Sequence, residues 1–243
     1  AEHKFALALA LENPESDFMD ETAQKRYTNT YDPTTAGNIG FDRVPDGIAR
    51  LYLIRPWGGV SLGGITREIR ILNPNVVSKA TRGYGGAVAL HLYTIGKDKF
   101  MFQVFGGNGI GRYIFDAAGQ GAFYDSRTHM LSTQKSYGGY IAYQHWWADC
   151  WRSTLIGSAM KIHNNPFLIN LRGPIGGPFP DVTRRTYAMI ANILYTPVKD
   201  LSLGFEFVRA KRFTEDKRSG RMTRIQFGLK YIYGDYYTGK QNL

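Results

Sequence analysis

The last amphipathic stretch of the chain, residues 221–233, alternates between apolar and polar residues. Thr223, Ile225, Phe227, Leu229 and Tyr231 fall on one face, and Met222, Arg224, Gln226, Gly228 and Lys230 fall on the other. A period of two is typical of a β-strand with one apolar and one polar face. In a soluble protein the apolar face would point into a core. In an outer-membrane barrel it would point to lipid and the polar face to the lumen.

Aromatic residues at the end of this stretch favour the membrane. Tyr231, Tyr233, Tyr236 and Tyr237 cluster where the strand would leave a bilayer, and amphipathic rings prefer that interface. The 16 Tyr, 14 Phe, 4 Trp and 28 Gly, with 21% charged residues, suit many strands joined by turns. No run approaches the ~18 apolar residues of a membrane helix. A mean hydropathy of -0.30 does not argue against a barrel, because every second residue of a barrel strand faces the lumen.

The same pattern predicts an all-β fold of about eleven or twelve strands in an antiparallel up-and-down barrel. A first strand covers residues 5–11, and the predicted hairpins join 48–55 to 60–71, 83–94 to 100–106, 137–146 to 151–161, and 186–195 to 201–211. Their turns are short, whereas residues 15–45 and 163–183 are polar or rich in Gly and Pro and are expected to form long external loops. Short turns on one side and long loops on the other are typical of outer-membrane barrels, and less so of a soluble sandwich. The pattern leaves open whether residues 13–46 fold into the pore.

The chain is basic, with 30 Lys and Arg against 20 Asp and Glu and a formal charge of +10. This charge favours an anionic partner. The candidates are nucleic acid, an anionic lipid such as lipopolysaccharide, and a small acidic solute. The alternative is a solvated basic surface. We interpret Lys211-Arg212 with Lys217-Arg218 as an exposed loop in reach of lipopolysaccharide phosphates. Cys150 is the single cysteine, so no disulfide framework exists, and no signal peptide opens the chain, so we expect that any targeting segment was removed or never included.

Several segments carry a wider resemblance. They are Gly107–Ile114, Gly138–His145, Trp151–Leu155, Ala191–Val198, Leu203–Arg212 and Arg224–Phe227, preceded by residues 49–51 and Trp57-Gly58. In this order, over nearly the whole chain, they resemble the C-terminal portion of DcaP-like porins. The resemblance implies a homotrimeric outer-membrane barrel of sixteen strands in a Gram-negative bacterium. It also implies the passage of small anionic solutes, including dicarboxylates.

Two departures from this family shape the expected domain organisation. Members of the family carry an N-terminal coiled coil and several earlier strands, whereas this chain begins in mid-barrel. We therefore expect residues 1–234 to be a partial transmembrane barrel. Family barrels usually stop at a terminal aromatic residue, and residues 235–243 are expected to form an additional tail.

Strand parity gives a set of side chains that point to the lumen. If Ile225 and Phe227 face lipid, Arg224 and Gln226 face the pore. The pore-lining candidates are Arg50, Glu68, Arg70, His91, Gln103, Arg112, Gln144, Arg152, Glu206, Arg224, Gln226 and Lys230, with Thr66, Thr154 and Ser158 beside them. An inward guanidinium offers a planar fork to carboxylates, so a series of weak sites would lower the barrier for dianions without binding them tightly. The alternative is that each Arg pairs with Glu68, Glu206 or a loop carboxylate and only holds the wall in shape.

Other constellations give weaker hypotheses. Residues 107–111 look like a phosphate-binding loop, but no βαβ unit surrounds them. His145, Asp149 and Cys150 lie close enough to suggest a metal site, yet the neighbouring Trp residues indicate an interfacial aromatic belt. Ser153 or Ser158 with His145 or His163 would be the ingredients of a hydrolase, although no nucleophile-elbow spacing supports it.

The sequence therefore predicts a passive, anion-preferring outer-membrane porin that is not an enzyme, with no catalytic residue, cofactor or metal. Its expected partners are small anionic solutes, the lipid bilayer and lipopolysaccharide, and no nucleic acid. Two alternatives stay open. One is an outer-membrane barrel hydrolase, a lipase or a protease. The other is a soluble basic β-protein that binds nucleic acid.

Overall fold

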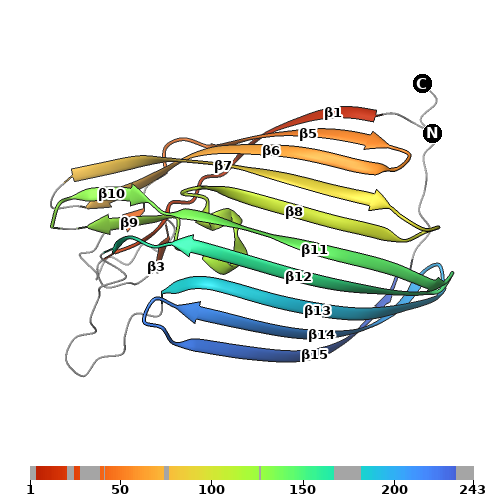
Figure 1. Cartoon of the computed structure of the whole chain (residues 1–243). Helices are drawn as coiled ribbons and strands as arrows, with labels where there is room; N and C mark the ends of the chain where they lie inside the picture. Colours follow the sequence, from red (N-terminus) through yellow and green to blue (C-terminus); the bar gives the residue numbers. More distant parts are fainter. Residues whose placement is uncertain are drawn as a thin grey trace.

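An antiparallel sheet of eleven strands dominates the computed structural model, which describes residues 4–20, 25–27, 39–40, 42–73, 77–125, 127–166 and 182–233 (Figure 1). Its strands are β1 (Lys4–Glu12), β4 (Ile39–Gly40), β5 (Asp46–Arg55), β6 (Gly58–Asn73), β7 (Val77–Tyr93), β8 (Lys99–Asn108), β11 (Lys135–Ala148), β12 (Trp151–His163), β13 (Thr183–Val198), β14 (Leu201–Thr214) and β15 (Ser219–Tyr231). They pair in the order β1-β5-β6-β7-β8-β11-β12-β13-β14-β15, with β4 also on β6. The up-and-down order and the four predicted hairpins are confirmed, and the described strands leave β1 and β15 as the two edges of an unclosed sheet.

The observed strands extend beyond the predicted ones at the end where the long connections lie. Backbone pairing between β6 and β7 continues out to Asn73 and Val77, and β14 runs to Thr214. The interpretation of Lys211-Arg212 as part of an exposed loop is therefore wrong, because both residues pair with β13 and β15. The predicted loop 163–183 connects β12 to β13, and residues 167–181 of it lie outside the described residues, as does the predicted tail 235–243.

A second, smaller sheet lies at the long-connection end of the large one (Figure 1). Its strands are β2 (Asp17–Met19), β3 (Lys25–Tyr27), β9 (Ala122–Asp125) and β10 (Met130–Thr133), in the order β10-β9-β2-β3. Phe18 of β2 is fully buried and packs with Ile69, Ile71 and Tyr124. The prediction that residues 15–45 form an external loop is therefore wrong for residues 16–20, which are buried.

The two faces of the large sheet differ in chemistry. We call the face that carries Arg50 the inner face and the opposite face, which carries Leu51, the outer face. Cross-strand partners share a face, so the register assigns every strand residue to one of the two. The outer face exposes large apolar side chains, among them Phe5 (70% exposed), Leu155 (56%) and Phe227 (70%). Exposed apolar surface of this extent marks a surface that contacts lipid or protein.

An insertion between β8 and β11 lies on the inner face. It contains two short 3₁₀ helices, η1 (Gly111–Tyr113) and η2 (Phe115–Ala117), followed by β9 and β10. Ile110 and Ile114 pack with Met160 and Ile162 of β12, and Phe105 of β8 packs against the same cluster. Because one insertion contacts strands that are not neighbours in the sheet, the sheet must curl around it.

Glycines make room for this insertion on the wall. A Cβ atom at Gly85 would lie 2.7 Å from the Ile110 side chain, and one at Gly107 would lie 3.1 Å from the same side chain. Gly109 begins the insertion with a φ of +73°, a left-handed conformation that glycine adopts without strain.

At the end of the sheet opposite the long connections, where the turns are short, the Asp98 carboxylate links the β7–β8 turn to β11. Asp98 follows the β7 strand, and its carboxylate accepts hydrogen bonds from the backbone N–H of Trp146 at 2.8 Å and from the hydroxyl of Tyr143 at 2.9 Å. His145 Nδ1 lies 2.6 Å from the same carboxylate. The Trp146 N–H and then His145 hold the pKa of Asp98 below its ordinary value. One carboxylate thus joins the β7–β8 turn to β11.

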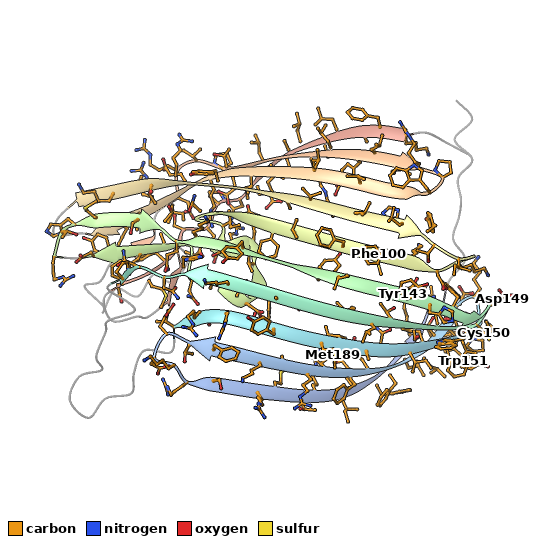
Figure 2. All side chains as sticks on the ribbon, in the orientation of Figure 1. Phe100, Tyr143, Asp149, Cys150, Trp151 and Met189 are labelled. Atoms are coloured by element: carbon orange, nitrogen blue, oxygen red, sulfur yellow. The ribbon has the colours of Figure 1, made fainter. Side chains whose placement is uncertain are left out.

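Aromatic rings gather at this turn end, where Figure 2 labels Trp151 beside Asp149 and Cys150. The rings of Trp151 and Tyr195 stack at 4.3 Å between centroids. Trp147 is 67% exposed on the outer face. This arrangement agrees with the predicted aromatic belt. As for helices, none among the described residues is both long and apolar enough to cross a membrane.

We predict that Asp98→Ala lowers the thermal unfolding temperature, because the Trp146 N–H and the Tyr143 hydroxyl lose their acceptor. Heat-dependent migration of the detergent-solubilised protein in gels is the measurement. Asp149→Ala in the next turn is the control, since Asp149 is 94% exposed and bonds Lys97 alone among the described side chains. Equal unfolding temperatures for the two variants would contradict the role given to Asp98.

Candidate functional site

A row of polar side chains crosses the inner face on six strands. Its members occupy consecutive cross-strand positions and are Lys99, Gln144, Thr154, Asn192, Glu206 and Gln226. We call this set the polar row. The sequence prediction found Gln144, Glu206 and Gln226 by parity, and the register adds Asn192 of β13 and Lys99 of β8.

Hydrogen bonds fix the geometry of the polar row. Gln226 Nε2 donates to Glu206 Oε1 at 2.8 Å, and Gln144 Nε2 donates to Thr154 Oγ1 at 3.5 Å. The backbone N–H of Thr154 donates to Asn192 Oδ1 at 3.2 Å. Side chains that are held in this way present donors and acceptors at fixed positions along the wall.

Three cations of the inner face stack on aromatic rings. The charged groups of Arg50, Lys99 and Arg152 lie 4.8, 5.0 and 5.1 Å from the ring centroids of Tyr52, Tyr93 and Trp146, respectively. Among the described residues, no carboxylate lies within ion-pair distance of these three cations. Of the carboxylates that the structure describes, none therefore neutralises Arg50 or Arg152 as the alternative would require. The alternative has partial support at Arg224, whose Nη2 lies 3.7 Å from Glu206 Oε1.

Two adjoining hollows open on the inner face. One, of about 400 Å³, is lined by Arg50, Ser61, His91, Lys99 and Tyr140 among others. The other, of about 280 Å³, lies between the wall and the insertion, and its lining includes Gln103 with Ile110 and Tyr113. Arg50 borders both hollows, and its Nη2 donates to Ser61 Oγ at 3.0 Å.

The register separates the predicted pore-lining residues into three groups. Those that share the inner face are Arg50, His91, Gln103, Gln144, Arg152, Glu206, Arg224, Gln226 and Lys230. Arg112 lies in the insertion. Glu68 and Arg70 lie on the outer face with Thr66, because Arg50 pairs with Gly63 and residues at even positions of β6 point the other way. The assignment of these three residues to the lumen is wrong, and Arg70 Nε instead pairs with Glu68 Oε1 at 2.9 Å.

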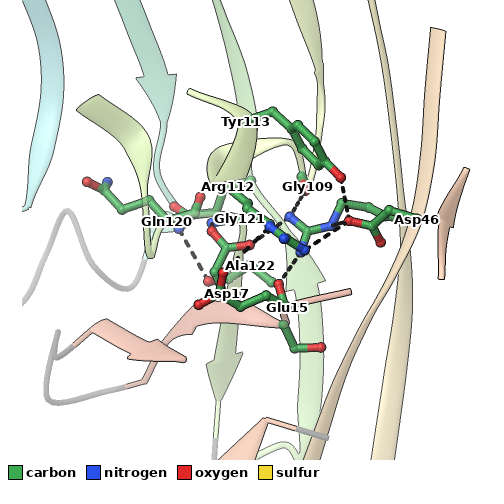
Figure 3. A network of polar contacts seen from close by, with 12 residues as sticks. Glu15, Asp17, Asp46, Gly109, Arg112, Tyr113, Gln120, Gly121 and Ala122 are labelled. Atoms are coloured by element: carbon green, nitrogen blue, oxygen red, sulfur yellow. Dashed lines mark hydrogen bonds and ion pairs between the residues drawn. The ribbon is translucent and has the colours of Figure 1, made fainter. Parts of the chain in front are cut away.

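The residue of β6 that does point inward here is Arg67, and it is completely buried. Its Nη1 lies 2.8 Å from Asp17 Oδ1 and donates to the carbonyl oxygen of Gly109 at 3.1 Å. Its Nη2 donates to the carbonyl oxygen of Glu15, and its Nε lies 3.5 Å from Asp46 Oδ2. Figure 3 shows the network that results. One guanidinium therefore fastens the segment before β2 and the start of the insertion to the wall.

Arg112 and Tyr113 of η1 close the same network from the other side (Figure 3). Tyr113 donates to Asp46 Oδ2 at 2.8 Å, and Arg112 lies 3.5 Å from both Asp46 Oδ2 and Glu15 Oε2. Arg112 Nη1 also donates to the carbonyl oxygen of Asn13 at 2.6 Å. The contacts of Arg112 thus hold the insertion in place.

Burial changes the protonation equilibria in this network. It raises the pKa of Asp17 from 3.8 to about 6, although the charge of Arg67 opposes the shift. Burial, together with the nearby carboxylate of Asp46, also raises the pKa of Tyr113. Asp17 Oδ2 accepts the N–H of Gly121 at 3.0 Å, so Asp17 bridges the wall to the far end of the insertion.

Parity did not reveal this network, because assigning Glu68 and Arg70 to the lumen placed Arg67 on the lipid face, whereas the register turns it inward. One signal was present. Residues 65, 69 and 71 are all Ile and share a face with Arg67, and a cation in an apolar row indicates a buried partner. The acidic partner Asp17 lies 50 residues away in a segment without periodicity.

The other constellations are not assembled as catalytic or metal sites. The hydroxyl of Ser153 accepts a hydrogen bond from Trp147 Nε1 at 2.9 Å, while His145 is bonded to Asp98. Ser158 lies on the inner face opposite Tyr140, whereas His145 lies on the outer face. Within the described ranges, no three His, Cys, Asp or Glu side chains come together as a potential metal site.

The fold and these surfaces define the class of this protein, which is a membrane protein that is built from β-strands, as in outer-membrane barrels. Its outer face is apolar, its inner face is polar, and tight turns lie at one end with long connections at the other. A family model described as "DcaP outer membrane protein" matches residues 34–233, so the chain belongs to the DcaP outer membrane protein family. This membership confirms the predicted family and the outer-membrane location, and it rules out the soluble alternative.

A solved structure has the same fold. The crystal structure of the outer membrane channel DcaP of Acinetobacter baumannii superposes with a TM-score of 0.67 at 16% sequence identity. The superposition covers 93% of this chain and 61% of that channel, so the chain spans less than two thirds of its length. No curated protein matches the chain. Both matches are described as membrane proteins and neither as an enzyme.

We predict that Arg67→Met destabilises the protein by about 3–5 kcal/mol, because it leaves Asp17 and Asp46 buried without their cation. Urea unfolding in detergent micelles, followed by Trp fluorescence, measures this change. Arg70→Met on the same strand is the matched control. It removes a partly exposed pair and is expected to cost about 1 kcal/mol or less. A loss in Arg67→Met no larger than in Arg70→Met would contradict the central position of Arg67.

We also predict a pH dependence that Asp17 generates. Between pH values of about 4 and about 6 the folded protein holds Asp17 protonated while the unfolded chain has it ionised, so its contribution to stability falls as pH rises through this window. Above pH 6 the contribution is constant. Asp17→Asn should remove this slope from the unfolding free energy, whereas Asp149→Asn should keep it. An unchanged slope in Asp17→Asn would show that Asp17 titrates normally.

Proposed function

We propose that this protein is an outer-membrane porin that passes small anionic solutes, such as dicarboxylates, by passive diffusion along its inner face. The observation that carries the proposal is the set of inner-face cations Arg50, Lys99 and Arg152, which stack on aromatic rings and lie beyond ion-pair distance of every carboxylate that the structure describes. A cation without a carboxylate partner keeps its field available to a passing anion. Membership of the DcaP family and the fold shared with a DcaP channel support the same function.

The mechanism is attraction at several weak sites without bond chemistry. Arg50 and Arg152 offer planar pairs of N–H donors to a carboxylate, and Lys99 offers a point charge between them in the register. The polar row replaces part of the hydration shell of the solute through its amide and hydroxyl groups. Because no single site encloses the anion, it leaves each site as readily as it enters.

The insertion narrows the path. Ile114 and Tyr113 line the hollow beside the wall, and Arg50 borders that hollow as well. A solute that passes the insertion therefore comes close to Arg50. A cation beside the insertion makes the pore select by charge, since the field of a cation is strongest where the least water screens it.

Closure of the barrel and assembly are part of this proposal. An open edge in lipid would leave backbone N–H and C=O groups without partners, so β1 and β15 both need further strands beside them. A sixteen-stranded, homotrimeric assembly is the form that the family resemblance implies. Chemical cross-linking of the protein in outer membranes would test the trimer.

The test is the reversal potential of the purified protein in a planar bilayer under a KCl gradient. We predict anion selectivity, and we predict that Arg152→Glu combined with Arg224→Glu shifts the reversal potential toward cations. Glu206→Gln should shift it further toward anions. Arg221→Glu is the matched control, because it lies on β15 with Arg224 but on the outer face. No shift in the double variant, or an equal shift in the control, would contradict the proposed lumen.

A further inference from the structure

The outer face of β12 to β15 changes character along its length. Near the turn end this face is apolar and carries residues such as Leu155, Ile193, Phe205 and Phe227. Toward the long connections it carries cations instead, and these are Lys161, Arg185, Arg209, Lys211 and Arg221. Position by position, the outward residues of these four strands include no Asp or Glu.

The register brings these cations into direct opposition. Lys161 of β12 is the cross-strand partner of Arg185 of β13, and Lys211 of β14 is the partner of Arg221 of β15. Like charges at directly opposite positions destabilise a sheet. We call these four residues the basic belt. Its arrangement costs stability unless something anionic lies against it.

No carboxylate of the described chain fills that role. None of the four side chains makes an ion pair with any described residue. Arg185 and Lys211 instead lie over the ring of Phe213, at 4.5 and 4.4 Å from its centroid. Arg185 Nε is buried and has no hydrogen-bond partner among the described residues. Within the described ranges, the belt therefore has an unused donor at Arg185 Nε and no carboxylate that offsets its positive charge.

The height of the basic belt matches one surface of a bilayer. Trp151 and Tyr195 mark the aromatic belt at the turn end, and Lys161 follows Trp151 by about ten residues on β12, or ~33 Å along the strand. A strand tilt of about 40° reduces this to ~25 Å across the membrane, which is the height of the apolar band of an outer-membrane barrel. The belt thus lies at the headgroup level on the side of the long connections, which is the extracellular side in such barrels.

We propose that Lys161, Arg185, Lys211 and Arg221 bind the phosphate groups of lipopolysaccharide in the outer leaflet. Phosphate accepts the forked donors of Arg and the point charge of Lys, and several phosphates on one headgroup neutralise both cation pairs at once. Phosphorylated lipid is the occupant that fits a charged rim directly above an apolar, lipid-facing surface. A second copy of this chain fits less well, because two basic belts repel each other.

This site depends on the outer-membrane location and not on the selectivity of the pore. The inference also refines the sequence interpretation, since Lys211 contacts phosphate from a strand rather than from a loop. Arg212, its neighbour, points to the inner face, where its Nε donates to Thr183 Oγ1 at 2.8 Å. Adjacent cations of one strand thus serve different faces.

The test is the affinity of the purified protein in detergent for fluorescent lipopolysaccharide, compared with its dephosphorylated form. At ~1 kcal/mol for each cation near an anionic surface, Lys161→Gln with Arg185→Gln should weaken binding about thirtyfold, and Lys211→Gln with Arg221→Gln should do the same. Arg224→Gln, on the inner face of β15, is the matched control and should keep the wild-type affinity. Wild-type binding should also weaken steeply with NaCl, which gives a measure that needs no variant.

Three results would overturn the proposal. They are unchanged affinity in both double variants, equally tight binding of the dephosphorylated glycolipid, and an altered oligomeric state with lipid binding intact, which would make this face an interface between copies. The reversal potential of the double variants separates this site from the pore. It should stay at the wild-type value, whereas a failure of the proposed porin function would show in the wild-type protein itself.

Discussion

Every surface of this protein depends on the two-residue alternation of an antiparallel ladder whose backbone hydrogen bonds must be satisfied inside the sheet. In lipid no water replaces a lost bond, so the register cannot slip, and each residue belongs to one face. Residues that are neighbours in the sequence therefore lie on opposite faces and contact different surroundings. Arg224 faces the polar row while Ile225 faces lipid, and Lys211 joins the basic belt while Arg212 points inward. The same constraint divides the cations of this basic sequence into two sets. One set lies on the inner face and the other on the outer face, so the two sets contact different partners.

A buried cation, Arg67, fixes the position of the insertion against the wall. The wall alone would enclose an open lumen, but Arg67 holds both the segment around Asp17 and the start of the insertion at Gly109. Charge buried in this way is costly unless its geometry is fixed, so the network specifies one position for the insertion rather than many. That position brings Tyr113 beside the hollow that Arg50 borders. The structural ion network and the proposed path of the solute are thus parts of one arrangement.

Much of the fold could be predicted from the local sequence pattern, because residues of a β-strand alternate between its two faces with a period of two. The four hairpins and the inner placement of Gln103, Arg152 and Glu206 could be predicted in this way. Glu68 and Arg70 were misplaced because the alternation is inverted near the end of β6, where the apolar Ile69 and Ile71 point inward and pack against the smaller sheet instead of facing lipid. The insertion and the Arg67 network were missed for a different reason. They are built from contacts between residues 21 to 104 positions apart, and such contacts produce no periodic pattern in the sequence.

Accessibility along β15 tests the assignment of the two faces most directly. Single cysteines at alternate positions, Arg224→Cys, Gln226→Cys and Gly228→Cys against Ile225→Cys, Phe227→Cys and Leu229→Cys, would be made in a Cys150→Ser background and treated in bilayers with a charged, water-soluble thiol reagent. We predict rapid modification and an altered conductance at the even positions and protection at the odd ones. Equal reactivity at both parities, or protection of the even positions, would contradict an inner face that is filled with water.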